Sequence, residues 1–248
     1  MANWNDPQST RAGFGTSPSR EGMAGDAVGF DAGLRKHMLS IYNYMASGVL
    51  LTGIVALLFA ASGMAAQVMT GGPLTWLIIL SPLAIVFAMS FGANKFSTGT
   101  LQLMFWAFAT LMGLSLSTIF LRYTGQSIAT TFFATAAAFA GLSLFGYTTK
   151  KDLSGMGTFL IMGVVGILIA MVVNIFVGST ALQMAISVLG VLIFAGLTAY
   201  DTQRLKREYF ALRGTQFAGK AIILGALSLY LDFINMFQFL LSFLGSRE

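Results

Sequence analysis

Seven long apolar runs, separated by short polar connections, dominate the sequence after residue 30. They occupy residues 41–63, 74–92, 101–121, 128–147, 156–177, 181–200 and 221–244. Each is close to the roughly 20 residues that a helix needs to cross the hydrocarbon core of a bilayer. Lipid offers the backbone no hydrogen-bond partners, so a spanning segment must be a helix or part of a closed barrel. A barrel needs alternating segments of about ten residues. The sequence therefore predicts an all-α polytopic membrane protein with seven transmembrane helices.

The composition excludes an ordinary soluble domain. Of the 248 residues, 56% are hydrophobic and only 9% are charged, whereas a soluble domain carries about 25% charged residues. The net charge of +5 does not indicate nucleic-acid binding, because the basic residues gather in the connections, where they face an anionic membrane surface. We expect the lipid bilayer as a partner and no nucleic acid. The absence of cysteine excludes a disulfide framework and a thiolate metal site.

Residues 1–30 are polar, rich in Gly and Ser and without periodicity, which predicts a disordered cytoplasmic tail before a transmembrane domain at residues 31–248. Twelve of the fourteen Lys and Arg residues fall on the side of this tail, and only Arg122 and Arg247 fall on the other. This excess places the N-terminus in the cytoplasm. Seven full crossings put the C-terminus outside, whereas a re-entrant last segment would put it inside. The sequence leaves these two alternatives open.

Small residues recur every four positions in two of the runs. One stripe lies in the first run and the other in the third; their members are Gly48, Thr52, Ala56, Ala60, Ala109, Gly113 and Ser117. Such stripes let helix backbones approach closely in lipid. We interpret them as packing surfaces without a chemical role.

Two aspartates interrupt the last two apolar runs. Asp232 lies deep in the seventh run and Asp201 at the end of the sixth. A carboxylate within the membrane is costly, so it normally faces the bundle interior or a water-filled cavity. Ser228 and Asn235 stand four residues before and three residues after Asp232, which places all three on one helix face.

Depth is the obstacle to a meeting of Asp201 with Asp232. Asp232 lies about 18 Å of helix rise beyond Lys220, so the acids meet only if the last helix begins later or the sixth extends past Tyr200. Two adjacent carboxylates in low dielectric share a proton and titrate as a pair. The alternative is that each acid is satisfied separately, Asp201 by Arg204.

Known enzyme sites fit the sequence poorly, and we expect neither an enzyme nor a cofactor. The single histidine, His37, sits in a basic cluster before the first run, so no base is available to a serine inside the membrane. Two aspartates are also the residues of an intramembrane aspartyl protease. Tyr200 before Asp201 fits that pattern, but the sequence around Asp232 does not.

Two motifs resemble the Bax inhibitor-1 family in its bacterial branch. They are SLYLDFINMF at residues 228–237 and AYDTQ at residues 199–203, and weaker pieces are KKDLS at 150–154 and NIF at 174–176. The resemblance implies a seven-helix fold in which the last helix is central and wrapped by the other six. It also implies a pH-dependent calcium or cation leak in the bacterial inner membrane.

The same resemblance implies roles for individual residues. Asp201 and Asp232 match the family's paired aspartates, a pH sensor beside a cation pore, and would contact cations transiently rather than hold a resident metal. Ser228, Asn235 and Tyr200 would support the pair as polar neighbours. A basic residue after the second span latches onto the pair in bacterial relatives, and Lys95 falls at that position.

A second hypothesis is a regulatory membrane protein. Some bacterial members of the family bind and modulate an AAA-type membrane protease, and eukaryotic members restrain cell death. The polar tail at residues 1–30 favours this hypothesis, because an unfolded cytoplasmic arm suits engagement by such a protease or by another stress-response partner.

Overall fold

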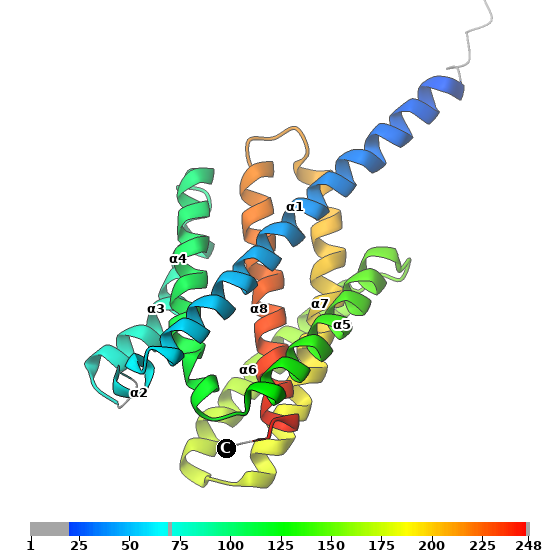
Figure 1. Ribbon diagram of the computed structural model, residues 1–248. Helices are drawn as coiled ribbons and strands as arrows, with labels where there is room; N and C mark the ends of the chain where they lie inside the picture. The colour runs from blue at the N-terminus through cyan, green and yellow to red at the C-terminus, as the bar shows by residue number, and fades with distance from the viewer. Residues whose placement is uncertain (1–19, 69–70, 247–248) are drawn as a thin grey trace, which may run out of the picture. The chain divides into compact units, whose positions relative to one another are not determined.

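The computed structural model describes residues 20–68 and 71–246, with side chains from residue 32 onward, and helices account for most of this part of the chain (Figure 1). The helices are α1 (Arg20–Ala61), α2 (Met64–Val68), α3 (Pro73–Gly92), α4 (Thr98–Leu116), the 3-10 helix η1 (Ser117–Leu121), α5 (Gly125–Thr148), α6 (Ser154–Val177), α7 (Thr180–Leu212) and α8 (Ala218–Leu244). Seven helical segments are long and apolar enough to cross a membrane. The predicted all-α fold with seven spans is confirmed.

The boundaries differ from the predicted ones at two helices. Helix α7 continues to Leu212, well beyond the predicted end at Tyr200. Helix α1 begins at Arg20, inside the range predicted as a tail. Residues 1–19 lie outside the described part of the chain, so the predicted disorder remains a prediction for them. The chain divides into units at residues 1–36 and 37–248, and the packing described below is that of the second unit.

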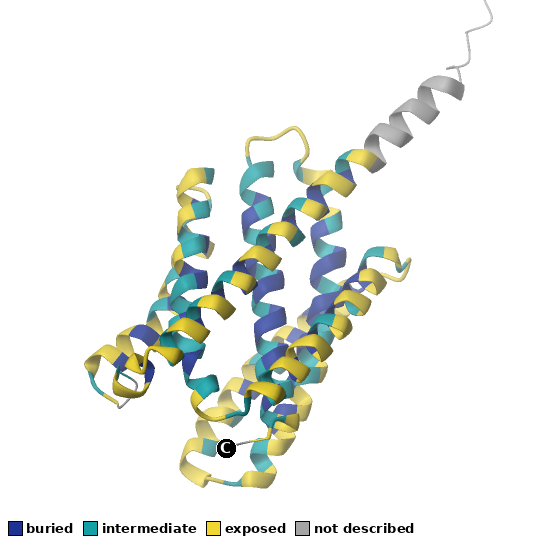
Figure 2. Ribbon diagram, viewed as in Figure 1, coloured by how far each residue is buried: buried dark blue, intermediate teal, exposed yellow. Residues whose placement is uncertain are grey.

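Helix α8 is the central helix of this unit. In its most apolar stretch 67% of the residues are buried, against 28% or less in each of the other spans, and Figure 2 shows the resulting dark core along α8. Its most extensive packing is against α7, followed by α5 and α4. The prediction of a central last helix is confirmed, and α8 has the length of a full crossing.

Helix α6 is the most peripheral span. Only 11% of its most apolar stretch is buried, and Phe159, Ile175 and Phe176 are each more than 70% exposed. A soluble protein would not display such a surface, but lipid solvates it without cost. The exposed apolar side chains of the bundle therefore form its lipid-facing surface.

The two small-residue stripes face each other between α1 and α4. Thr52 Oγ1 donates a hydrogen bond of 2.8 Å to the Ala109 carbonyl. A Cβ added at Gly113 would stand 2.7 Å from Val55 Cβ and 2.8 Å from the Thr52 carbonyl oxygen. Only glycine permits this approach, so the interpretation of the stripes as packing surfaces is confirmed.

Side chains from α7 and α8 tie the basic connections together at one end of the bundle. Lys220 Nζ donates to the carbonyls of Ala93 at 3.0 Å and Asn94 at 3.3 Å. Lys206 Nζ donates to the Tyr147 carbonyl at 2.9 Å. Gln203 accepts from Leu153 N at 2.9 Å and donates to the Lys151 carbonyl at 2.8 Å. The α3–α4, α5–α6 and α7–α8 connections therefore lie at the same end, which we call the basic end.

The C-terminal end of α8 joins the opposite end of the bundle. Thr124 N donates to the Ser246 carbonyl at 3.2 Å, and Ser246 N donates to Ser127 Oγ at 3.0 Å. Ser246 thus lies beside the η1–α5 turn, away from the basic connections, as a full crossing of α8 requires.

Candidate functional site

The extension of α7 brings Asp201 to the level of the polar face of α8. Asp201 lies eleven residues before Leu212, or about 17 Å of helix rise, and Ser228 lies ten residues after Ala218, or about 15 Å. The two helices run antiparallel across one short connection, so these positions come together. Extension of the sixth span past Tyr200 was one of the two conditions for the aspartates to approach, and the structure meets it.

Asp201 is buried and fully engaged. It is 5% exposed, and its Oδ2 accepts a hydrogen bond of 2.5 Å from Ser228 Oγ. Arg204, one turn further along α7, lies with Nη1 3.2 Å from Asp201 Oδ1 and Nη2 3.3 Å from Oδ2. Arg204 Nη2 also donates to Ser228 Oγ at 3.0 Å. The three side chains form a closed triangle across the α7–α8 interface.

Asp232 lies one turn beyond Ser228 on α8. It is also 5% exposed, and it is close enough to Asp201 and Arg204 to interact with both charges. Among the described residues, nothing hydrogen-bonds to its Oδ2. The bond from Asp201 to α8 runs to Ser228, and within the described part of the chain no hydrogen bond joins the two carboxyl groups. The two acids therefore interact electrostatically and not through a direct hydrogen bond.

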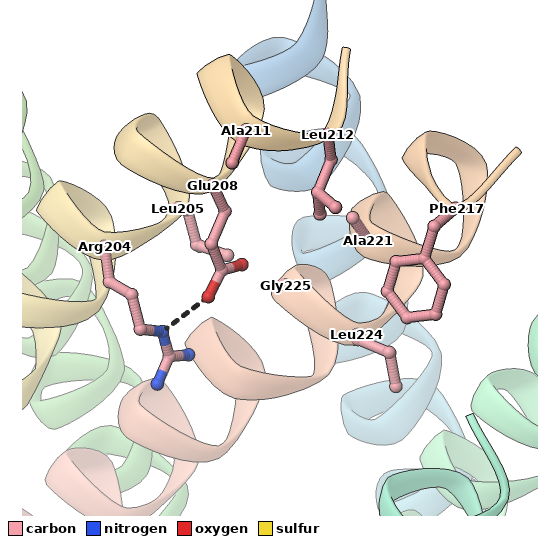
Figure 3. Close-up of a pocket in the computed structure, with 9 residues that line it drawn as sticks. All are labelled: Arg204, Leu205, Glu208, Ala211, Leu212, Phe217, Ala221, Leu224 and Gly225. Atoms are coloured by element: carbon pink, nitrogen blue, oxygen red, sulfur yellow. Dashed lines mark ion pairs between the residues drawn. The ribbon is translucent and has the colours of Figure 1, made fainter. Parts of the chain in front are cut away.

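A third carboxylate shares the same guanidinium. Arg204 Nε lies 3.3 Å from Glu208 Oε1, and both side chains line a pocket of about 410 Å³ between α7 and α8. Figure 3 shows this ion pair on one wall of the pocket, with Phe217, Ala221 and Leu224 on the other. The Arg204 guanidinium thus pairs directly with two carboxylates, Asp201 and Glu208, and interacts electrostatically with a third, Asp232.

The three remaining predicted residues, Tyr200, Asn235 and Lys95, differ in what they contact. The Tyr200 ring centroid is 5.9 Å from the Arg204 guanidinium carbon. Asn235 donates to the Leu231 carbonyl of its own helix at 2.8 Å. Lys95 lies exposed in the α3–α4 turn, and in the described part of the chain no ion pair links it to either aspartate. Its role as a latch stays a prediction, and Arg204 is the basic residue that contacts Asp201.

The sequence contained a signal for the Arg204–Glu208 pair. Asp201, Arg204 and Glu208 are spaced by three and four residues, which aligns them on one face of a continuous helix. Ending the sixth span at Tyr200 hid that alignment, although Arg204 had been considered as a partner of Asp201.

No resident metal cluster is evident in the described residues: no three His, Asp or Glu side chains there gather in a way that could hold an ion. Transient contact of Asp201 and Asp232 with cations stays a prediction.

His37 packs against the Tyr209 ring, with centroids 5.1 Å apart.

Comparison with known proteins identifies the family. The family model described as "Inhibitor of apoptosis-promoting Bax1" matches residues 34–248. The chain is 50% identical over 231 residues to an uncharacterized protein of Caulobacter vibrioides, covering 88% of this chain and 91% of the relative. It is 46% identical over 221 residues to the inner membrane protein YbhL of Escherichia coli, covering 88% and 94%, and 42% identical over 219 residues to protein RP147 of Rickettsia prowazekii, covering 88% and 93%. This multi-pass membrane protein belongs to the Bax inhibitor-1 family.

Proposed function

We propose that the protein is a pH-sensitive cation leak of the bacterial inner membrane, with calcium as the favoured ion, gated by protonation of Asp201 and Asp232. The observation that carries the proposal is Asp232, buried in the central helix with one carboxyl oxygen unpartnered among the described residues. A charged carboxylate in that position is costly unless a proton or a cation compensates it.

Charge balance supplies the gating step. Arg204 is a cation in direct contact with both Asp201 and Glu208. When Asp232 is also ionised, the α7–α8 interface carries an excess of negative charge, which favours a hard cation such as calcium. Protonation of Asp232 lowers that excess from two negative charges to one and weakens the attraction for the ion. We therefore propose that the protonated pair closes the path and that ionisation opens it.

We propose that the N-terminus and the basic end face the cytoplasm. The connections at that end hold Lys95, Lys150, Lys151 and Arg213, and Lys and Arg accumulate in cytoplasmic connections. The E. coli relative is named an inner membrane protein. Fusion of a topology reporter after residue 246 tests this orientation, and cytoplasmic reporter activity there would contradict it.

Calcium flux into proteoliposomes tests the leak itself. The purified full-length protein is reconstituted around a trapped calcium indicator, and the initial rate is measured across a pH series spanning neutrality. We expect a leak that rises with pH, and Asp201→Asn combined with Asp232→Asn should abolish the pH dependence. Asp152→Asn is the matched control, because Asp152 is an exposed loop carboxylate. An unchanged pH dependence in the double variant would refute the sensor.

A regulatory role is the second candidate, supported by the polar N-terminal segment. The match to the family model begins at residue 34, so the segment predicted to engage an AAA-type membrane protease precedes the conserved family region. Crosslinking and pull-down from native membranes, with the full chain and with residues 1–30 removed, tests this role. Equal recovery of the same partners by both chains would contradict it. We propose no enzymatic reaction under either candidate function.

A further inference from the structure

We propose that the pocket between α7 and α8 is the mouth through which a hard cation reaches the aspartates, that Glu208 is the carboxylate that first receives the ion, and that Arg204 is the tethered cation that closes the mouth. The inference rests on the proposed leak function and assigns two residues to its control.

The pocket provides the space for such a mouth. Its volume is about 410 Å³, and Arg204 and Glu208 supply its charged groups (Figure 3). The rest of the lining is apolar or glycine: Leu205, Ala211, Leu212, Phe217, Ala221, Leu224 and Gly225. Low-dielectric walls around a few charges strengthen their field, which concentrates counter-ions in the cleft.

Exposure falls stepwise from the pocket inward. The Glu208 side chain is 41% exposed, Arg204 34% and Asp201 only 7%. Arg204 contacts Glu208 through Nε and Asp201 through both Nη atoms, so its guanidinium stands between the pocket and Asp201. A cation that moves from the pocket to Asp201 must therefore displace Arg204.

Competition between charges drives the exchange. Calcium binds carboxylate oxygens, and Glu208 presents one at the exposed side of the guanidinium. An ion bound there competes with Arg204 for Glu208, and Asp201 and Asp232 attract it further inward. The charged and polar groups that face Arg204 are Asp201, Glu208 and Tyr200 from α7, with Ser228 in contact and Asp232 in electrostatic range from α8.

The competing interpretation is a helix-surface ion pair without a role in permeation. Exposed pairs spaced by four residues contribute little to stability. Helix α7 also contains a second paired arginine that can serve as a control. Arg207, also on α7, pairs with the exposed Asp152 at 2.7 Å and does not line the pocket. Arg207→Gln therefore removes the same charge from the same helix without opening the proposed mouth.

Flux measurements separate the two interpretations. In the proteoliposome assay we expect Arg204→Gln to raise the calcium leak at every pH, and Glu208→Gln to raise the calcium concentration needed for half-maximal flux. Each change should be about fivefold, the factor that one unit charge at 4 Å gives in bulk water. Arg207→Gln should leave both quantities unchanged. If Arg204→Gln matches Arg207→Gln while the aspartate variants alter the leak, this inference is wrong and the proposed function stands.

Thiol labelling tests the mouth without relying on a leak. The chain has no cysteine, so Leu224→Cys or Ala211→Cys places a single thiol on the pocket wall. We compare its reaction rates with a cationic and an anionic methanethiosulfonate reagent added at the basic end. Arg204→Gln should raise the rate with the cationic reagent about fivefold and lower the rate with the anionic reagent by a similar factor, and Glu208→Gln should do the reverse, with Arg207→Gln unchanged. Thiols that do not react, or a ratio insensitive to both pocket variants, would overturn the inference whether or not the protein leaks calcium.

Discussion

The hydrogen-bonded chain Tyr230–Thr52–Ala109 gives a sharp test of how α8 is held in the bundle. Thr52 Oγ1 donates to the Ala109 carbonyl at 2.8 Å and lies 2.6 Å from Tyr230 Oη. A hydroxyl carries one proton, and Thr52 uses its own for Ala109. Tyr230 must therefore donate to Thr52, which makes the two partners unequal. The perturbations are Tyr230→Phe and Thr52→Val.

The magnitudes follow from what each substitution leaves behind. Tyr230→Phe removes a donor and leaves Thr52 still donating to Ala109, so it should cost about 0.6 kcal/mol, the average for a side-chain hydrogen bond between membrane helices. Thr52→Val preserves the shape but leaves the Tyr230 hydroxyl, which is 0% exposed, without an acceptor. An unsatisfied buried polar group costs about 1–3 kcal/mol, so Thr52→Val should be the more damaging change.

Thermal unfolding of the purified protein in detergent measures the difference. For a chain of this length 1 kcal/mol shifts the Tm by about 2–4 °C, so we expect about 1–2 °C for Tyr230→Phe and about 2–12 °C for Thr52→Val. The double variant should be less destabilised than the sum, because no hydroxyl is then left unpaired. Equal effects of the single variants, or strict additivity, would refute the assigned proton direction.

Three further predictions use the same measurement. Asp232→Asn should leave the Tm equal to or above that of the wild type, because the amide carries no charge at a buried position where Oδ2 has no hydrogen-bond partner among the described residues, whereas Asp201→Asn should lower it through the loss of the Arg204 pair. Gly146→Leu should prevent folding, because its Cβ would overlap a backbone carbonyl of α7. Hydrogen bonds from Ser154 lower the pKa of Asp152 in the folded protein below its ordinary value of 3.8. The ionised carboxylate therefore contributes fully to stability above pH 3.8, and this contribution is lost as the pH falls through the pKa of the folded state. Asp152→Asn should remove this acid-dependent part of the Tm curve.

The spans were predictable because the bilayer fixes the length of each apolar run. The end of α7 was not, because residues 201–212 include five charged side chains and resemble a loop by hydropathy. In the structure these side chains form pairs within α7 and with the α5–α6 connection, such as Arg204–Glu208 and Arg207–Asp152. Hydropathy does not detect such pairs, although the four-residue spacing of Arg204 and Glu208 does indicate one.

The aspartates were identified from the free-energy cost of placing a carboxylate in lipid. An acid in an apolar run normally faces the bundle interior or a water-filled cavity. Their partners were harder to predict, because a contact between helices depends on rotation and depth that one sequence does not specify. The family resemblance pointed to Lys95 as the latch. In the structure, the side chain that reaches the α3–α4 turn is Lys220 of α8, and Arg204 reaches Asp201 from one turn along its own helix.

The length of α7 explains why charged residues are tolerated in a membrane-spanning helix. Its 33 residues rise about 50 Å, whereas the hydrocarbon core is about 30 Å thick. The apolar residues up to Tyr200 fill the core, so Asp201 lies at its edge and Glu208 beyond it. Asp232, one turn past Ser228 on the neighbouring helix, lies deeper than Asp201. Glu208 is the most exposed of the three acids, and Asp201 is paired with Arg204, so the cost of an uncompensated buried charge falls on Asp232. A gate is expected at Asp232, because there the gain or loss of one proton or one cation changes the energy most.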